Sequence, residues 1–184
     1  DRVEKLVEEV KRHVTEVLKT VEDLARRIRD HVRKVEDTSR ELVKEIKRLV
    51  EEILDRVRKK KDKRELLKEL LDRLKKAVKK IRDTNRELNK SNEKLVRDIR
   101  DTLRKLTDSN RRLLEDIDKK LEEAPEDVVR ELRRVLRESN EKLKEVVDRL
   151  RKVLEESTKR VEDASRRVER VLEKVEEDVK REAT

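Results

Sequence analysis

Apolar residues recur every seven positions through the first third of the chain. One such series comprises Val7, Val14, Val21, Ile28, Val35 and Leu42. A second series, which includes Val10, Val17 and Leu24, lies between its members, so apolar positions are spaced by about 3.5 residues on average. The last third of the chain repeats the pattern with Val129, Leu136, Leu143 and Leu150. Such sustained heptads predict long amphipathic helices that pack together along apolar seams.

Two short stretches interrupt the heptads. Near residues 59–65 the apolar spacing lapses, and Asp62 with Glu65 three residues later resembles a helix N-cap and its capping-box partner. The only proline, Pro125, precedes two acidic residues, which suits the first turn of a helix. We therefore expect helices over about 2–60, 63–123 and 125–182, each of about 60 residues and about 90 Å long.

Three segments of nearly equal length predict an all-α fold. The expected architecture is an antiparallel, up-down-up three-helix bundle with left-handed, coiled-coil-like packing. We interpret residues 1–184 as a single domain, one three-helix bundle.

Polar residues replace apolar ones at particular seam positions. Asn85 and Asn92 occupy a heptad series that is otherwise apolar on both sides. If the chain folds back at the two breaks, residue i of the first segment lies level with about 123 − i of the second. Residue j of the second segment then lies level with about 250 − j of the third. This pairing predicts which polar residues meet.

The pairing gathers uncharged polar residues from all three segments at three levels. The first level contains His31, Asn92, Ser157 and Thr158. The second contains Thr38, Ser39, Asn85, Asn89 and Ser165. The third contains His13, Ser109, Asn110, Ser139 and Asn140. A buried polar group without a partner costs about 1–3 kcal/mol, so we expect each level to be a buried, mutually hydrogen-bonded layer that penalises slipped registers.

Composition agrees with a helical bundle. Charged residues make up 56% of the 184 residues, hydrophobic residues 32%, and the chain contains no Gly, Cys or aromatic Phe, Trp or Tyr. Regular apolar periodicity argues against disorder, which is the competing interpretation of so much charge. No apolar run approaches the roughly 18 residues of a membrane span, so we expect a soluble chain without membrane contact.

The net charge of +9 raises the question of a polyanionic partner. Acidic and basic residues alternate along every segment, and the one notable basic run begins at Arg58, next to the first break. Proteins that bind single-stranded nucleic acid also use aromatic stacking platforms, which this chain lacks. Weak, salt-sensitive attraction to polyanions is expected, and specific nucleic-acid recognition is not.

Candidate chemistry is sparse. His13 and His31 are 18 residues apart, about 27 Å along one helix, so they cannot share a metal ion. The chain contains no cysteine, and without glycine it cannot form a glycine-rich phosphate loop. A slender helical bundle also offers no concave site for a nucleophile and a base. We therefore expect no catalytic residues, no metal and no cofactor. Protonation of a buried His31 is expected to disturb its layer in mild acid.

The whole chain resembles de novo designed helical bundles with buried hydrogen-bond layers. The resemblance rests on the absence of glycine, the Glu, Lys and Arg surface, the single-proline turn, and polar core pairs such as Ser139-Asn140. It implies a structural scaffold without a natural biochemical function or a required partner. The alternative that it implies is a module that binds a designed helical partner or self-associates, as one component of an oligomer or switch. Apolar residues that flank the seam of the third segment suit either role; they are Val128, Val135, Val147 and Leu154.

Overall fold

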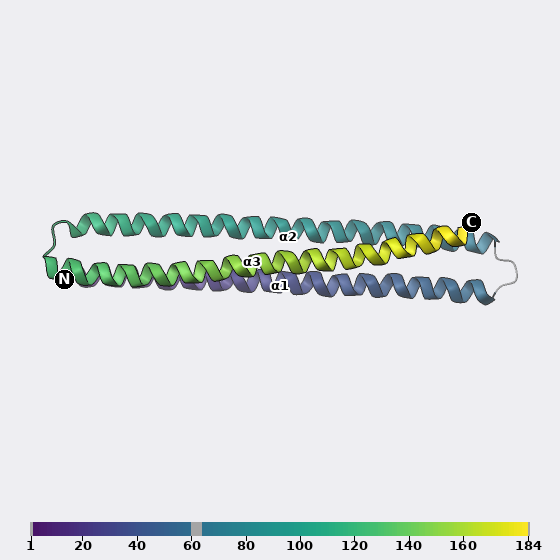
Figure 1. The fold of residues 1–184 in the computed structure, drawn as a ribbon, viewed down its shortest axis with the longest axis horizontal. Helices are drawn as coiled ribbons and strands as arrows, with labels where there is room; N and C mark the ends of the chain where they lie inside the picture. The colour runs from purple at the N-terminus through teal and green to yellow at the C-terminus, as the bar shows by residue number, and fades with distance from the viewer. Residues whose placement is uncertain (1, 60–63, 184) are drawn as a thin grey trace. The chain divides into compact units, whose positions relative to one another are not determined.

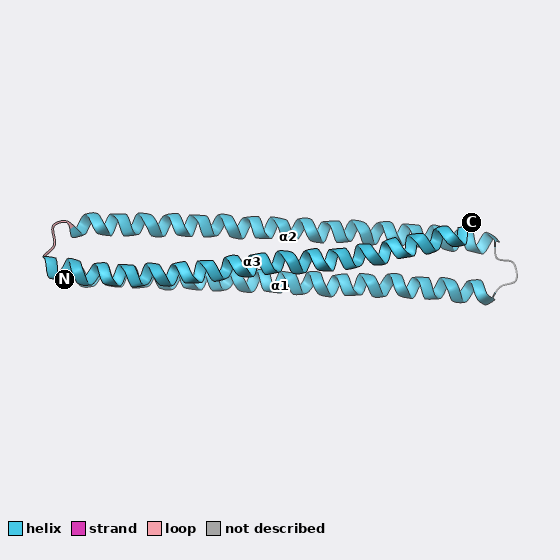
Figure 2. Ribbon diagram, in the orientation of Figure 1, coloured by secondary structure: helices cyan, strands magenta, loops and turns pink. Residues whose placement is uncertain are grey.

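The chain forms three long helices. A computed structural model describes residues 2–59 and 64–183, in which α1 spans Arg2–Lys59, α2 spans Arg64–Leu121 and α3 spans Glu126–Ala183. Each helix contains 58 residues, and no strand occurs in the described part of the chain (Figure 2). The predicted all-α class and the number of helices are confirmed. The predicted helix ends at residues 60 and 63 lie outside the described residues, and the other helix ends differ from the prediction by at most two residues.

The connection between α2 and α3 is short and hydrogen-bonded. The Ala124 amide donates to the Leu121 carbonyl at 3.1 Å, and the Val129 amide donates to the Pro125 carbonyl at 3.1 Å. Pro125 thus lies one residue before α3 rather than within its first turn, and its carbonyl accepts the first hydrogen bond of the helix. Between α1 and α2, the predicted N-cap residue Asp62 lies outside the described residues.

The helices contribute to two compact units. The first unit comprises Asp1–Arg29 and Leu95–Glu156, and the second comprises Asp30–Lys94 and Ser157–Thr184. Within each unit, α2 runs antiparallel to α1 and α3, as the colour gradient in Figure 1 shows. The interpretation of the chain as a single domain stays a prediction.

Each unit has its own apolar core, built from all three helices. The core of the first unit consists of Val10, Ile117, Leu121, Leu132 and Leu136. The core of the second unit consists of Ile46, Ile53, Leu70, Leu74, Val78, Ile81, Val168, Leu172, Val175 and Val179. Because heptad positions fall on one stripe of each helix, the seam residues meet in these cores and the charged residues remain at the surface.

None of the three described helices contains a stretch that is both long and apolar enough to cross a lipid bilayer.

Candidate functional site: polar residues between the helices

One group of predicted layer residues forms a hydrogen-bonded cluster between α2 and α3. Asn85 is buried and donates from Nδ2 to the hydroxyl oxygen of Ser165 at 3.1 Å and to the carbonyl oxygen of Ser165 at 3.3 Å. Asn89 donates from Nδ2 to the same hydroxyl oxygen at 2.6 Å. Since Asn85 and Asn89 are four residues apart, they lie on one face of α2 and reach one acceptor. We call these three residues the Asn85 cluster.

The α1 members of the same level do not join the Asn85 cluster. Ser39 is only 5% exposed, and Thr38 is half-buried. Among the described residues, no hydrogen bond connects either side chain to Asn85, Asn89 or Ser165, and the Ser39 hydroxyl oxygen has no partner. The hydrogen bonds at this level therefore connect two helices rather than three.

The level that contains His31 and Asn92 is partly buried and is not fully hydrogen-bonded. Asn92 and Ser157 are buried, whereas His31 and Thr158 are half-buried. In the described part of the chain, His31 Nε2 and Asn92 Oδ1 have no hydrogen-bond partner. A buried amide oxygen without a hydrogen-bond partner lowers the free energy of unfolding by about 1–3 kcal/mol, because it has lost its contact with water.

Burial gives His31 an altered acid–base equilibrium. Loss of solvation lowers the pKa of His31 below its ordinary value of 6.5, and the nearby charge of Lys34 lowers it further. The neutral imidazole is therefore favoured in the folded protein more than in the unfolded chain.

A pH dependence of stability follows from this lowered pKa. Between pH 6.5 and the folded pKa, the unfolded chain binds the proton more readily, so acidification lowers the free energy of unfolding there and has no such effect above pH 6.5. We expect His31→Asn to lose less stability than the wild type between about pH 7.5 and about pH 5. Urea unfolding at both pH values measures the difference, and an equal loss in the two proteins would contradict it.

The third predicted level is the most exposed. Asn110 Nδ2 donates to Asn140 Oδ1 at 3.4 Å, which joins α2 to α3. Asn140 and Ser109 are exposed, contrary to the predicted burial, whereas His13, Asn110 and Ser139 are half-buried. Consecutive residues point about 100° apart on a helix, so a one-residue offset from the seam turns a side chain towards solvent. His13 Nε2 has no hydrogen-bond partner among the described residues.

An ion-pair cluster that the sequence interpretation missed lies near the Asn85 cluster. Arg82 on α2 contacts Glu176 at 2.8 Å and Glu169 at 3.4 Å, both on α3. The hydrogen bond that Arg82 donates to Glu176 is the largest effect that raises the pKa of Arg82 above its ordinary value, and so holds it in the charged form. The pairing rule places Arg82 level with about residue 168, so applying it to charged residues as well would have found Glu169.

No group of three or more His, Cys, Asp or Glu residues suitable for a metal ion occurs among residues 2–59 and 64–183.

Comparisons with known proteins agree with the helical architecture. No protein-family model matches the chain, and a search of curated proteins finds no match. One similar solved structure is a "Computationally designed three helix bundle", with a TM-score of 0.62 and 16% sequence identity over 98% of this chain and 92% of that chain. At this identity the likeness concerns the fold. The chain therefore has the three-helix-bundle fold that is also found in a computationally designed protein.

Proposed function

We propose that the chain is a designed, non-enzymatic scaffold whose polar layers specify the register of its helices. The Asn85 cluster is the observation that supports this role. It joins the buried Asn85 amide of the second unit to the half-buried side chains of Asn89 and Ser165, at a heptad position whose preceding member, Val78, is apolar. Hydrogen bonds of this kind add little net stability, so their value to the protein lies in specificity.

A slipped register would leave the Asn85 cluster unpaired. If α3 moved by one heptad in one direction, Leu172 would take the place of Ser165 opposite Asn85. Leu172 has no side-chain acceptor, so the Asn85 and Asn89 amides would lose their hydrogen bonds to the Ser165 hydroxyl, at a cost of about 1–3 kcal/mol for the buried Asn85 amide. A movement of seven residues displaces a helix by about 10 Å, which a spectroscopic ruler can resolve.

The register can be measured with a pair of spin labels. Because the chain contains no cysteine, Arg86→Cys on α2 and Arg166→Cys on α3 provide two unique labelling sites, both exposed. We expect one narrow distance in this background. Adding Asn85→Leu, Asn89→Leu and Ser165→Ala is expected to produce a second distance population, from molecules in which α3 has moved by about 10 Å along α2.

An exposed serine at the third level provides the matched control. The substitution Ser109→Ala removes a hydroxyl that water can solvate, so the distance between the labels should stay single. If the apolar variant of the Asn85 cluster also keeps one distance, the cluster does not specify register and the proposal fails.

Self-association is the second candidate function. Leu54 on α1 is 42% exposed, which is unusual for a large apolar side chain of this protein. The flanking positions on α3 give less support, because Val128, Val135 and Val147 are half-buried and Leu154 is buried. Light scattering over a range of concentrations separates the candidates. A constant monomeric mass supports the scaffold, and a dimer supports self-association.

A further inference from the structure

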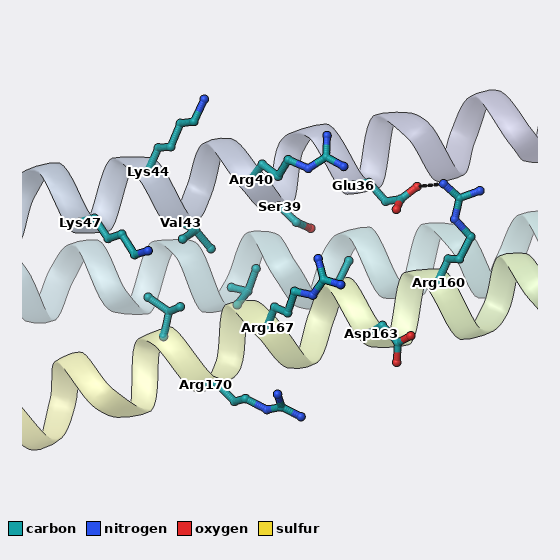
Figure 3. Close-up of a pocket in the computed structure, with 13 residues that line it drawn as sticks. Glu36, Ser39, Arg40, Val43, Lys44, Lys47, Arg160, Asp163, Arg167 and Arg170 are labelled. Carbon is teal, nitrogen blue, oxygen red and sulfur yellow. Dashed lines mark hydrogen bonds and ion pairs between the residues drawn. The ribbon is translucent and has the colours of Figure 1, made fainter.

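A groove of about 550 Å³ lies between α1 and α3 in the second unit (Figure 3). Residues 36–47 of α1 and 160–171 of α3 line it, so it is about three helical turns, or about 16 Å, long. Its apolar lining consists of Val43, Ala164, Val168 and Val171. The volume falls within the range of about 300–1,000 Å³ that is typical of sites for small organic ligands.

Two cationic side chains are available at the groove. Figure 3 shows the guanidinium of Arg167 directed from α3 towards α1, and the ammonium of Lys47 lying between the two helices. Among the described residues, neither of these side chains forms an ion pair. Lys47 and Arg167 therefore provide unpaired positive charge beside an apolar surface.

The other charged side chains at the groove are paired or, like Arg170 in Figure 3, directed away from α1. Arg40 pairs with Asp37 at 3.4 Å, and Lys44 pairs with Glu41 at 3.9 Å, in both cases within α1. The Glu36 carboxylate is paired with Arg160 at one end of the groove (Figure 3).

The remaining carboxylate does not oppose an anion in the groove. In Figure 3, Asp163 directs its carboxylate away from α1. The field within the groove is thus positive, and it favours an anion that Lys47 and Arg167 can contact.

Ser39 supplies a polar group at the same place. Its side chain points from α1 towards α3 in Figure 3, is 5% exposed, and has a hydroxyl without a hydrogen-bond partner. Rotation about its single χ angle between staggered positions redirects the hydroxyl within the groove. The Ser39 hydroxyl has no acceptor within the described residues, so it can donate a hydrogen bond to an anionic oxygen at this level.

We propose that this groove binds a small organic carboxylate with an aliphatic chain, of the medium-chain fatty-acid type. The carboxylate contacts Arg167, Lys47 and the Ser39 hydroxyl, while the chain covers Val43 and Val171. Arg167 suits the carboxylate because its planar guanidinium can donate two parallel hydrogen bonds. Burial of the aliphatic chain against these valines adds favourable binding free energy, which an inorganic anion cannot gain. The inference is independent of the scaffold role.

Titration of the ¹⁵N-labelled protein with octanoate, followed by NMR, tests this site. We expect saturable shifts confined to residues near 36–47 and 160–171, and weaker binding of 1-octanol, which has the same chain without the charge. Arg167→Gln and Ser39→Ala are each expected to weaken octanoate binding by about tenfold, because each removes a hydrogen bond to a charged group. Ser39→Ala should not lower the thermal midpoint, since the hydroxyl that it removes is unpaired.

Arg104→Gln provides the matched control. Arg104 lines a different groove of about 350 Å³ between α2 and α3 in the first unit, so this substitution should leave octanoate binding unchanged. Equal affinity for 1-octanol, unchanged binding by Arg167→Gln and Ser39→Ala, or shifts spread over both units would each overturn the proposal.

Discussion

Leu172→Ala is expected to lower the free energy of unfolding by about 2–5 kcal/mol. Leu172 is fully buried on α3, within the core of the second unit. Truncation removes the favourable transfer of the side chain from water and leaves a cavity that its neighbours fill only in part. Guanidinium unfolding followed by far-UV circular dichroism measures the loss as a lower midpoint.

Leu54→Ala is the matched control for this core substitution. The same atoms are removed from a side chain that is 42% exposed, so the change in free energy should be under about 1 kcal/mol. If the two variants are equally destabilised, the second unit does not pack around Leu172 in solution as it does in the structure.

Asn92→Leu is expected to raise the free energy of unfolding by about 1–3 kcal/mol. Asn92 is 3% exposed, and its Oδ1 has no hydrogen-bond partner among the described residues. Leucine removes the cost of this unpaired oxygen and adds apolar contact in the same seam. Denaturant unfolding at neutral pH measures the gain.

The same substitution at Asn85 provides an internal comparison. Asn85 donates two hydrogen bonds to Ser165, and replacing it leaves these acceptor atoms with fewer partners. Asn85→Leu should therefore gain less stability than Asn92→Leu. A loss of stability in Asn92→Leu would mean that the Asn92 amide is satisfied in solution.

The fold could be predicted from the sequence because its signal is local and repeated. The heptads require only that apolar residues share one face of a helix. The seven-residue spacing of Val14, Val21 and Ile28 indicates such a face without information from the rest of the chain. The helix ends are less certain because they depend on single residues. Pro125 fits both the first turn of α3 and the position before it, and the hydrogen bond of its carbonyl decides between them.

The polar levels could be predicted in part. Counting back from the turns places Asn85 level with Ser165, and Asn110 level with Asn140, and these pairs are hydrogen-bonded. Counting gives the height along a helix and not the rotation about its axis, which is why Asn140 was expected to be buried although it is exposed. Hydrogen bonding also depends on side-chain reach at the scale of an ångström, so the unpaired oxygen of Asn92 has no signature in the sequence.

The double acceptance by Ser165 has a chemical consequence for its neighbourhood. With both lone pairs of its hydroxyl oxygen engaged by amides, this residue can offer only its proton to any further group. A neighbouring side chain with an acceptor oxygen could receive a hydrogen bond from this hydroxyl, whereas an ammonium or a guanidinium, which can only donate, could not bond to it. The hydrogen bonds already made by Ser165 thus determine which side chains can form a further hydrogen bond with its hydroxyl.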